Sequence, residues 1–175
     1  MTSQLLSDEF LSAMATAASS RFRTYQEIRL EFEIYGATVS WTEMAQTAEG
    51  AWVSIDFSDA APLDRRALKS DKAASYTKGR GTWFAARLTL VPDEEPRFER
   101  FETEPLERAP GALQMPVPPA AVQAELALFP REQEWIPGWM RDILESNGLD
   151  VPYLDPATEE LVLGSERAPF QDPAQ

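Results

Sequence analysis

A strict alternation of apolar and charged residues over residues 26–36 constrains the fold of this chain more than any other sequence feature. Ile28, Leu30, Phe32 and Ile34 fall on one side of an extended segment, and charged residues fall between them. Because successive side chains of a strand point to opposite faces, the pattern predicts a half-buried β-strand. Strands of this kind are typical of antiparallel sheets that are covered on one side.

Four later segments extend this strand into a sheet. Gly36 ends the first strand, and residues 37–47 and 51–57 predict a second and a third strand joined by turns. Residues 82–92 predict a fourth strand, and residues around 98–102 a weaker fifth. In the fourth strand the alternation predicts an inward set, which comprises Phe84, Ala86, Leu88 and Leu90. The same alternation places Trp83 and Arg87 on the opposite face.

Helical spacing and proline positions predict the remaining elements. Residues 4–20 carry apolar side chains at helical spacing, and residues 61–74 predict a short helix with a basic outer side. Pro119 and Pro137 each precede an amphipathic segment, so each predicts the start of a C-terminal helix. The sequence therefore predicts an α+β fold. An antiparallel sheet of about five strands would carry an N-terminal helix, a short basic helix and two C-terminal helices packed on it.

The length of the chain favours a single domain over residues 1–175. Five prolines between residues 105 and 119 predict an extended connector, because proline cannot donate to a hydrogen-bonded ladder. The end of the chain, about residues 165–175, is predicted to fray.

The chain contains neither histidine nor cysteine. Triads and dyads that use imidazole or thiol groups are therefore excluded, as are thiolate zinc sites and disulfides. We accordingly expect a protein that is not an enzyme and needs no cofactor or metal. The alternative is an enzyme that uses carboxylates or lysine, and its signature would be a buried carboxylate pair of perturbed pKa in an open pocket.

A formal net charge of −13 disfavours nucleic acid and anionic membranes as partners and favours a basic one. The sequence contains no apolar run of the roughly 18 to 20 residues that a membrane span needs. The first residues lack the basic start and apolar centre of a signal peptide. We therefore expect an acidic cytoplasmic protein that binds neither nucleic acid nor membrane.

Two segments depart from the average charge. The basic residues of the first are Arg65, Arg66, Lys69, Lys72, Lys78 and Arg80. The acidic residues of the second are Asp93, Glu94, Glu95, Glu99, Glu102, Glu104 and Glu107. Each segment is either a solvated surface or a contact surface for a partner, and the composition is compatible with both interpretations.

Three motifs carry a resemblance to a known family. They are GRGTWFAARLTLVP over residues 79–92, RFERFETEP over residues 97–105 and AELALFPREQEWIPGWM over residues 124–140. With these motifs the stretch from residue 79 to residue 144 resembles the YezG-like bacterial immunity proteins. It is most similar to the actinobacterial immunity factors that protect against NAD-degrading toxins of the tuberculosis necrotizing toxin type. The motif residues are of the kind that determine a fold, packing the last helices on the sheet.

The resemblance implies a cytoplasmic antitoxin that binds a cognate secreted toxin, an NAD glycohydrolase, as a one-to-one heterodimer and blocks its active site. We expect the first contacts from Tyr76, Lys78, Gly79 and Arg80, and further contacts from Asp93, Glu94 and Glu95. The alternative is a secretion chaperone or adaptor protein, which would bind the toxin without inhibiting it.

Overall fold

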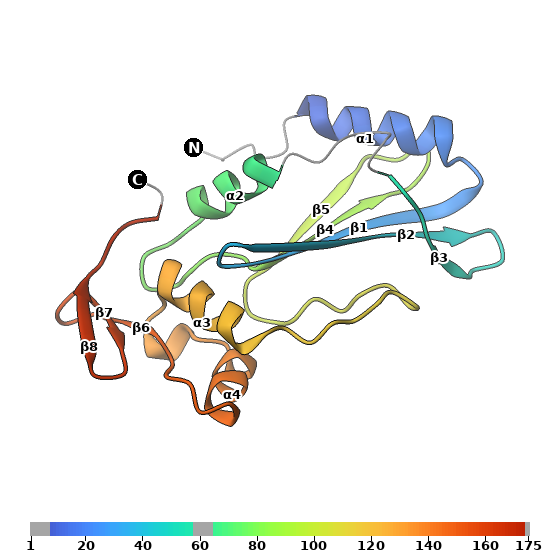
Figure 1. Ribbon diagram of the computed structural model, residues 1–175. Helices are drawn as coiled ribbons and strands as arrows, with labels where there is room; N and C mark the ends of the chain where they lie inside the picture. Colours follow the sequence, from blue (N-terminus) through green and yellow to red (C-terminus); the bar gives the residue numbers. More distant parts are fainter. Residues whose placement is uncertain (1–7, 58–64, 174–175) are drawn as a thin grey trace.

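The computed structural model describes residues 8–57 and 65–173, and its centre is a five-stranded antiparallel sheet. The strands are β1 (Tyr25–Tyr35), β2 (Thr38–Thr47), β3 (Trp52–Ser54), β4 (Ala85–Leu90) and β5 (Arg97–Phe101). They lie in the order β3-β2-β1-β4-β5, and every neighbouring pair is antiparallel (Figure 1). The predicted sheet is confirmed, with the strongly alternating strand at its centre.

The alternation of β1 determines which face of the sheet is buried. Ile28, Leu30, Phe32 and Ile34 are each at most 1% exposed and form the middle of the main core. Burial of four large apolar side chains from one strand contributes several kcal/mol, at about 1.5–3 kcal/mol each. The opposite face of β1 carries its charged residues. Only the apolar face of this strand therefore packs in the main core.

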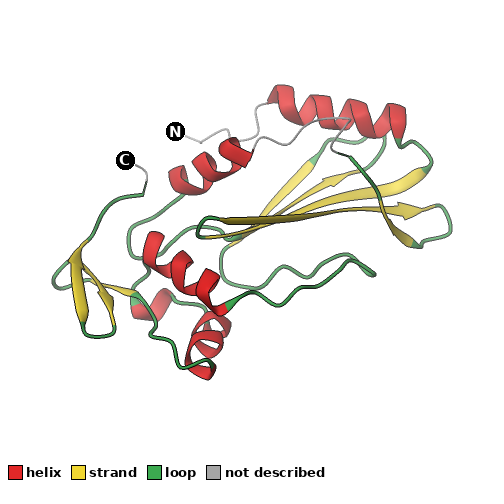
Figure 2. Ribbon diagram, viewed as in Figure 1, coloured by secondary structure: helices red, strands yellow, loops and turns green. Residues whose placement is uncertain are grey.

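Two helices cover the apolar face (Figure 2). They are α1 (Asp8–Arg21) and α2 (Arg65–Ala74), and both place buried side chains in the main core. Met14 and Ala18 come from α1, and Leu68 comes from α2. The two predicted N-terminal helices are thus present, although the predicted start of the second near Pro62 lies outside the described residues.

The C-terminal helices build a second core at the end of β1 and the start of β4. They are α3 (Pro119–Leu128) and α4 (Gly138–Ser146), with the short 3-10 helix η1 (Gln133–Trp135) between them. The ring of Trp139 lies edge-on to that of Phe84, with 5.1 Å between the ring centroids. As predicted, Pro119 is the first residue of α3 and Pro137 immediately precedes α4.

One prediction about the fourth strand is wrong. Regular pairing begins only at Ala85, so the alternation does not extend back to the two aromatic residues before it. Trp83 lies in the main core and Phe84 in the second core, and both are fully buried. The expected outward Trp83 is therefore a core residue, and Phe84 faces the C-terminal helices instead of α1.

A second, three-stranded antiparallel sheet follows α4, and the sequence did not predict it. Its strands are β6 (Tyr153–Asp155), β7 (Glu160–Leu163) and β8 (Glu166–Pro169). The predicted fraying of residues 165–175 is wrong for β8, which pairs along its length with β7. These strands have three or four residues each, and β8 is exposed throughout, so no alternation marks them.

Candidate functional site

The loop that precedes β4 has a rigid backbone. The amide of Thr77 donates to the carbonyl of Gly81 (2.9 Å), and the amide of Arg80 donates to the carbonyl of Thr77 (2.9 Å). Gly79 and Gly81 have φ values of +78° and +89°, a backbone conformation that favours glycine. The carbonyl of Gly79 also accepts from the amide of Glu132 (2.7 Å). The loop is therefore fixed both to itself and to the segment that leads into η1.

The predicted contact residues of this loop divide into anchors and exposed groups. Tyr76 is half-buried, and its hydroxyl donates to the carbonyl of Pro130 (2.9 Å). Burial raises the pKa of Tyr76 to about 12, so the phenol stays protonated near neutral pH. Gly79 is buried, whereas Lys78 and Arg80 are exposed. The loop thus holds two cationic side chains outward from a fixed base.

The two exposed cations have neighbours on the surface. Lys78 Nζ lies 2.6 Å from Glu159 Oε1 and 5.5 Å from the centroid of the Phe170 ring. The guanidinium of Arg80 lies 4.5 Å from the centroid of the Trp135 ring, close enough for a cation–π contact. Trp135 is itself 40% exposed, so this stacked pair presents both charge and apolar area to a partner.

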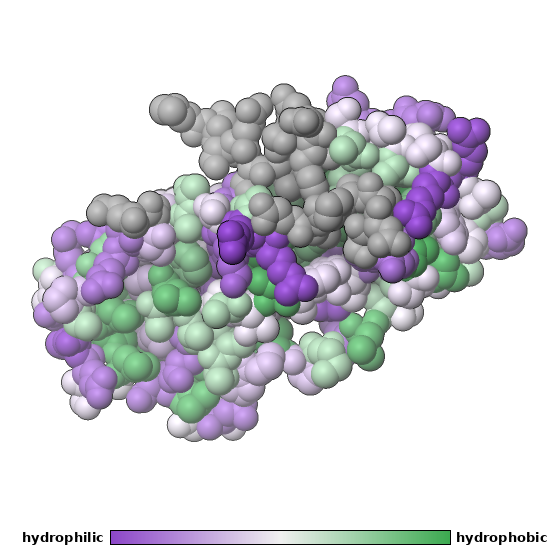
Figure 3. All heavy atoms as spheres, turned by 45° about the horizontal axis from the view of Figure 1, so that its top comes forward, coloured by the Kyte–Doolittle hydropathy of each residue, from purple (hydrophilic) through white to green (hydrophobic). Residues whose placement is uncertain are grey.

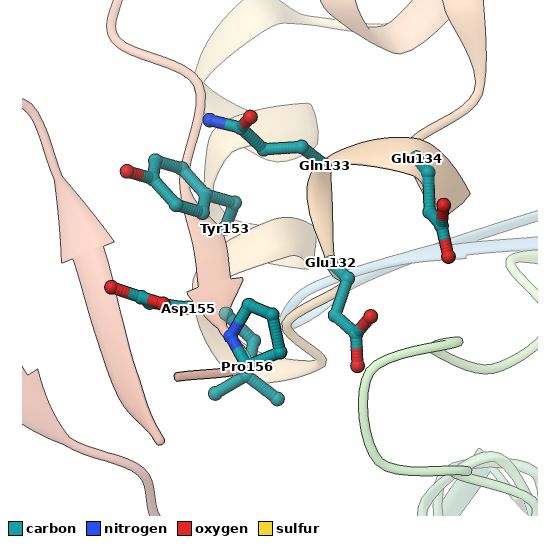
Figure 4. A pocket seen from close by; sticks show the side chains of 7 residues that line it. Glu132, Gln133, Glu134, Tyr153, Asp155 and Pro156 are labelled. Atoms are coloured by element: carbon teal, nitrogen blue, oxygen red, sulfur yellow. The ribbon is translucent and has the colours of Figure 1, made fainter. Parts of the chain in front are cut away.

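An acidic cleft of about 600 Å³ lies beside this loop, between η1 and β6. Its lining residues are Glu132, Gln133, Glu134, Tyr153, Leu154, Asp155 and Pro156. Figure 4 shows that the carboxylates do not converge: those of Glu132 and Glu134 point to one side and that of Asp155 to the other. Among the described residues, no group of three or more His, Cys, Asp or Glu side chains is arranged to hold a metal ion. The carboxylates that line the cleft are therefore not arranged as a metal cage (Figure 4).

Asp155 is held by partners at the rim of the cleft. The backbone amide of Ala157 donates to Asp155 Oδ1 (3.0 Å), and Arg167 Nη1 lies 3.1 Å from Oδ2. The backbone hydrogen bond from Ala157, followed by that from Arg167, lowers the pKa of the Asp155 carboxyl. This carboxylate is ionised near neutral pH, and the guanidinium of Arg167 compensates its charge.

The predicted acidic contact residues lie elsewhere. Asp93, Glu94 and Glu95 are exposed in the turn between β4 and β5, whereas the basic loop precedes β4. The amide of Asp93 donates to Ser19 Oγ in α1 (3.2 Å). Strand β4 separates the two groups, so the structure does not bring them together in one site. A surface that includes both would have to extend along β4.

A buried ion pair lies between the loop and the sheet. Lys72 Nζ donates to Glu125 Oε1 (2.7 Å) and to the carbonyls of Ile34 (2.9 Å) and Trp83 (2.7 Å). Glu125 Oε2 accepts from the amide of Gly36 (2.8 Å), and both charged side chains are 1% exposed. Burial lowers the pKa of Lys72 to about 8, although Glu125 opposes that change. All three N–H bonds of the ammonium group are used, so this lysine connects α2, β1 and α3 and is not presented as a nucleophile.

The burial of this pair removes Lys72 from the basic surface that the sequence predicted. Lys72 belongs to the predicted basic segment but is buried, and its neighbour Asp71 is buried beside it. Asp71 accepts from Trp83 Nε1 (3.0 Å) and pairs with Arg100 Nη2 (3.2 Å). Among the described residues, no buried side-chain nitrogen or oxygen lacks a hydrogen-bond partner. The sequence offered no local signal for the pair, because Glu125 lies far from Lys72 along the chain.

The surface around the site is mixed in character. Figure 3 shows hydrophilic and hydrophobic residues side by side over the end of the molecule that contains the C-terminal helices and β6–β8. None of the helices in the described ranges is both long and apolar enough to span a bilayer.

In comparisons with known proteins, the sequence matches no protein-family model and no curated protein.

Proposed function

We propose that this protein is an immunity protein that binds a cognate secreted toxin and blocks its active site. By the resemblance of residues 79–144, the toxin is an NAD glycohydrolase. The observation that carries the proposal is the pairing of a rigid cationic loop with an acidic cleft beside it. Lys78 and Arg80 project from a backbone that is hydrogen-bonded to Glu132, and Glu132 lines the cleft.

Rigid presentation supports an inhibitory role. An inhibitor that is already ordered loses little conformational entropy when it binds, so more of its contact energy appears as affinity. The backbone hydrogen bonds of Gly79 and Gly81 fix the loop before any partner arrives. The two cations and the stacked Trp135 then provide charge and apolar area at defined positions.

The residues that carry the resemblance have structural roles that agree with the proposal. Phe84, Ile136 and Met140 are buried in the second core, and Arg131 is 3% exposed beneath the loop. Arg131 Nη2 donates to the carbonyl of Thr82 (2.6 Å). These side chains hold the loop and the cleft in place, which leaves the exposed residues to determine which toxin is bound.

The negative charge of the chain supports a basic partner. At −13 the average field attracts a positively charged surface and raises the rate of encounter with it. A specific complex of ordinary size buries roughly 1,200–2,000 Å² in total. A contact surface of that size would include the cleft and neighbouring residues as well as the loop.

The direct test uses a purified toxin domain of the NAD glycohydrolase class, taken from the gene next to that of this chain where that gene encodes one. We expect equimolar protein to abolish NAD consumption by that domain, and light scattering after gel filtration to give the mass of a one-to-one complex. A stable complex in which NAD is still consumed would favour a secretion chaperone or adaptor. If no complex forms at micromolar concentrations, the proposal is wrong.

A further inference from the structure

The connector between β5 and α3 is ordered although it contains neither helix nor strand. Loops longer than about 12–15 residues without secondary structure are uncommon in compact domains, and those that are ordered usually have a function. Residues 102–118 run out and back beneath the sheet in Figure 1. We call residues 106–117 the arm. Leu106 and Ala109 are buried where the arm meets the sheet.

The charged face of the sheet holds the outgoing half of the arm, residues 106–109. Glu31 is 1% exposed, pairs with Arg87 Nε (3.1 Å), and accepts from the amide of Ala109 through Oε2 (3.2 Å). Glu33 pairs with Arg108, whose side chain is 8% exposed. In most half-buried sheets, carboxylates on the polar face point into water. In this protein, the carboxylates of Glu31 and Glu33 instead fix the path of the arm. The arm is therefore preorganised along its outgoing half.

A tight turn defines the tip of the arm. The amide of Ala112 donates to the carbonyl of Ala109 (3.0 Å), with Pro110 and Gly111 between them. Gly111 has φ +81°, and proline followed by glycine at these positions is typical of a type II turn. Pro110 also fixes its own φ angle, which reduces the freedom of the unbound arm.

The arm presents two apolar side chains to solvent. Leu113 is 72% exposed and Met115 is 63% exposed. No other large apolar side chain of the described residues is as exposed as these two. Arg108 Nη1 donates to the carbonyl of Leu113 (3.0 Å), so this part of the arm is also held from below. In Figure 3 a narrow projection at the lower right, the position of the arm, carries apolar residues. Two ordered apolar side chains at the surface offer a partner apolar area whose burial would favour binding.

We propose that the arm inserts Leu113 and Met115 into an apolar cleft with a basic rim on a partner protein. The proposal rests on the proposed function, and it makes that partner the toxin. Residues 109–118 contain no charged residue, although the chain as a whole carries −13. Glu104 and Glu107 are exposed beside the uncharged segment. An uncharged segment flanked by carboxylates complements an apolar pocket that is surrounded by basic groups.

The test compares the dissociation constants of two double variants for the toxin domain, made catalytically inactive. L113S/M115S removes the two exposed apolar side chains of the arm, and we expect binding to weaken about 10- to 100-fold, as for central apolar anchors. V53S/L128S is the matched control, because Val53 and Leu128 are exposed apolar residues outside the arm. The control should bind within about threefold of the wild type. Thermal unfolding should show that both variants remain folded.

Three outcomes would overturn the proposal. If the wild type does not bind the toxin domain, the proposed function fails and the arm proposal fails with it. If the wild type binds and L113S/M115S binds equally well, only the arm proposal fails. Analytical ultracentrifugation supplies the third outcome: a wild-type dimer that L113S/M115S disrupts would make the occupant a second copy of this chain.

Discussion

Two lysines from one stretch of sequence make ion pairs of nearly equal length in contrasting surroundings. Lys72 Nζ lies 2.7 Å from Glu125, and Lys78 Nζ lies 2.6 Å from Glu159. The first pair is 1% exposed on both sides, whereas the side chains of the second are 45% and 69% exposed. Water screens the exposed pair and is absent from the buried one, so the N–O distance alone does not determine what either contributes.

The difference indicates different roles for the two regions. The buried junction around Lys72 joins α2, β1 and α3, and breaking it would leave a charge without compensation in the core. The exposed ion pair of Lys78 contributes little to folding, and the charge of this lysine lies at the surface, where a partner can contact it. Four predictions test this contrast.

The largest expected effect is on folding. Lys72→Met removes the cation and leaves the Glu125 carboxylate buried, so we expect a loss of about 3–5 kcal/mol in the free energy of unfolding. Lys78→Met is the matched control, because the same change at the exposed pair should cost less than about 1 kcal/mol. Urea unfolding followed by circular dichroism measures both. Equal losses in the two variants would show that the contrast between the regions is wrong.

A glycine substitution tests how firmly the loop is held against the junction. A Cβ at Gly81 would lie 2.3 Å from Arg131 Nε, and Arg131 is buried and hydrogen-bonded. We expect Gly81→Ala to cost about 2–3 kcal/mol from backbone strain and the displaced guanidinium. Gly50→Ala is the control, since Gly50 also has positive φ but has nothing within 4 Å of a new Cβ. It should cost about 1 kcal/mol in urea unfolding, and a cost as large as that of Gly81→Ala would contradict the tight packing of the loop.

Charge reversal tests which exposed region binds the toxin. K78E/R80E should weaken binding of the toxin domain about 10- to 100-fold through lost contacts. E94K/E95K reverses the acidic turn at the other end of β4, and we expect a change of about threefold, mainly in the association rate. K78E/R80E makes the chain more negative, so a loss of affinity for a basic toxin would reflect local contacts. Surface plasmon resonance gives both rates, and the reverse ranking would move the site to the acidic turn.

The smallest expected effect is a pH dependence of stability. Burial lowers the pKa of Lys72 from 10.5 to about 8, so above pH 8 the unfolded chain binds more protons than the folded one. The contribution of Lys72 to stability therefore rises with pH, by about 1 kcal/mol from pH 7.5 to pH 9. The difference in unfolding free energy between the wild type and Lys72→Met should grow over this range. A constant difference would mean that the pKa of Lys72 is not lowered.

Elements with a strong local pattern could be predicted from the sequence, and elements without one could not. The alternation around Phe32 predicted the central strand, and Pro119 and Pro137 marked the starts of two helices. The second sheet has strands too short to show a period, so it was missed. The candidate site was predicted in part. The basic loop was found from its charge and glycines, whereas the cleft is formed by η1 and β6, which do not adjoin in sequence.

The antiparallel sheet, its apolar face and the helices that cover it could be predicted without the structure, because each follows from periodicity within a single segment. The sequence also determined the net charge and the absence of imidazole and thiol groups. Only the tertiary structure decided that Lys72 is buried while Lys78 is exposed, and that the two predicted contact groups lie at opposite ends of β4. Burial of a charge depends on a partner such as Glu125 that is distant along the chain, and no local pattern specifies that partner.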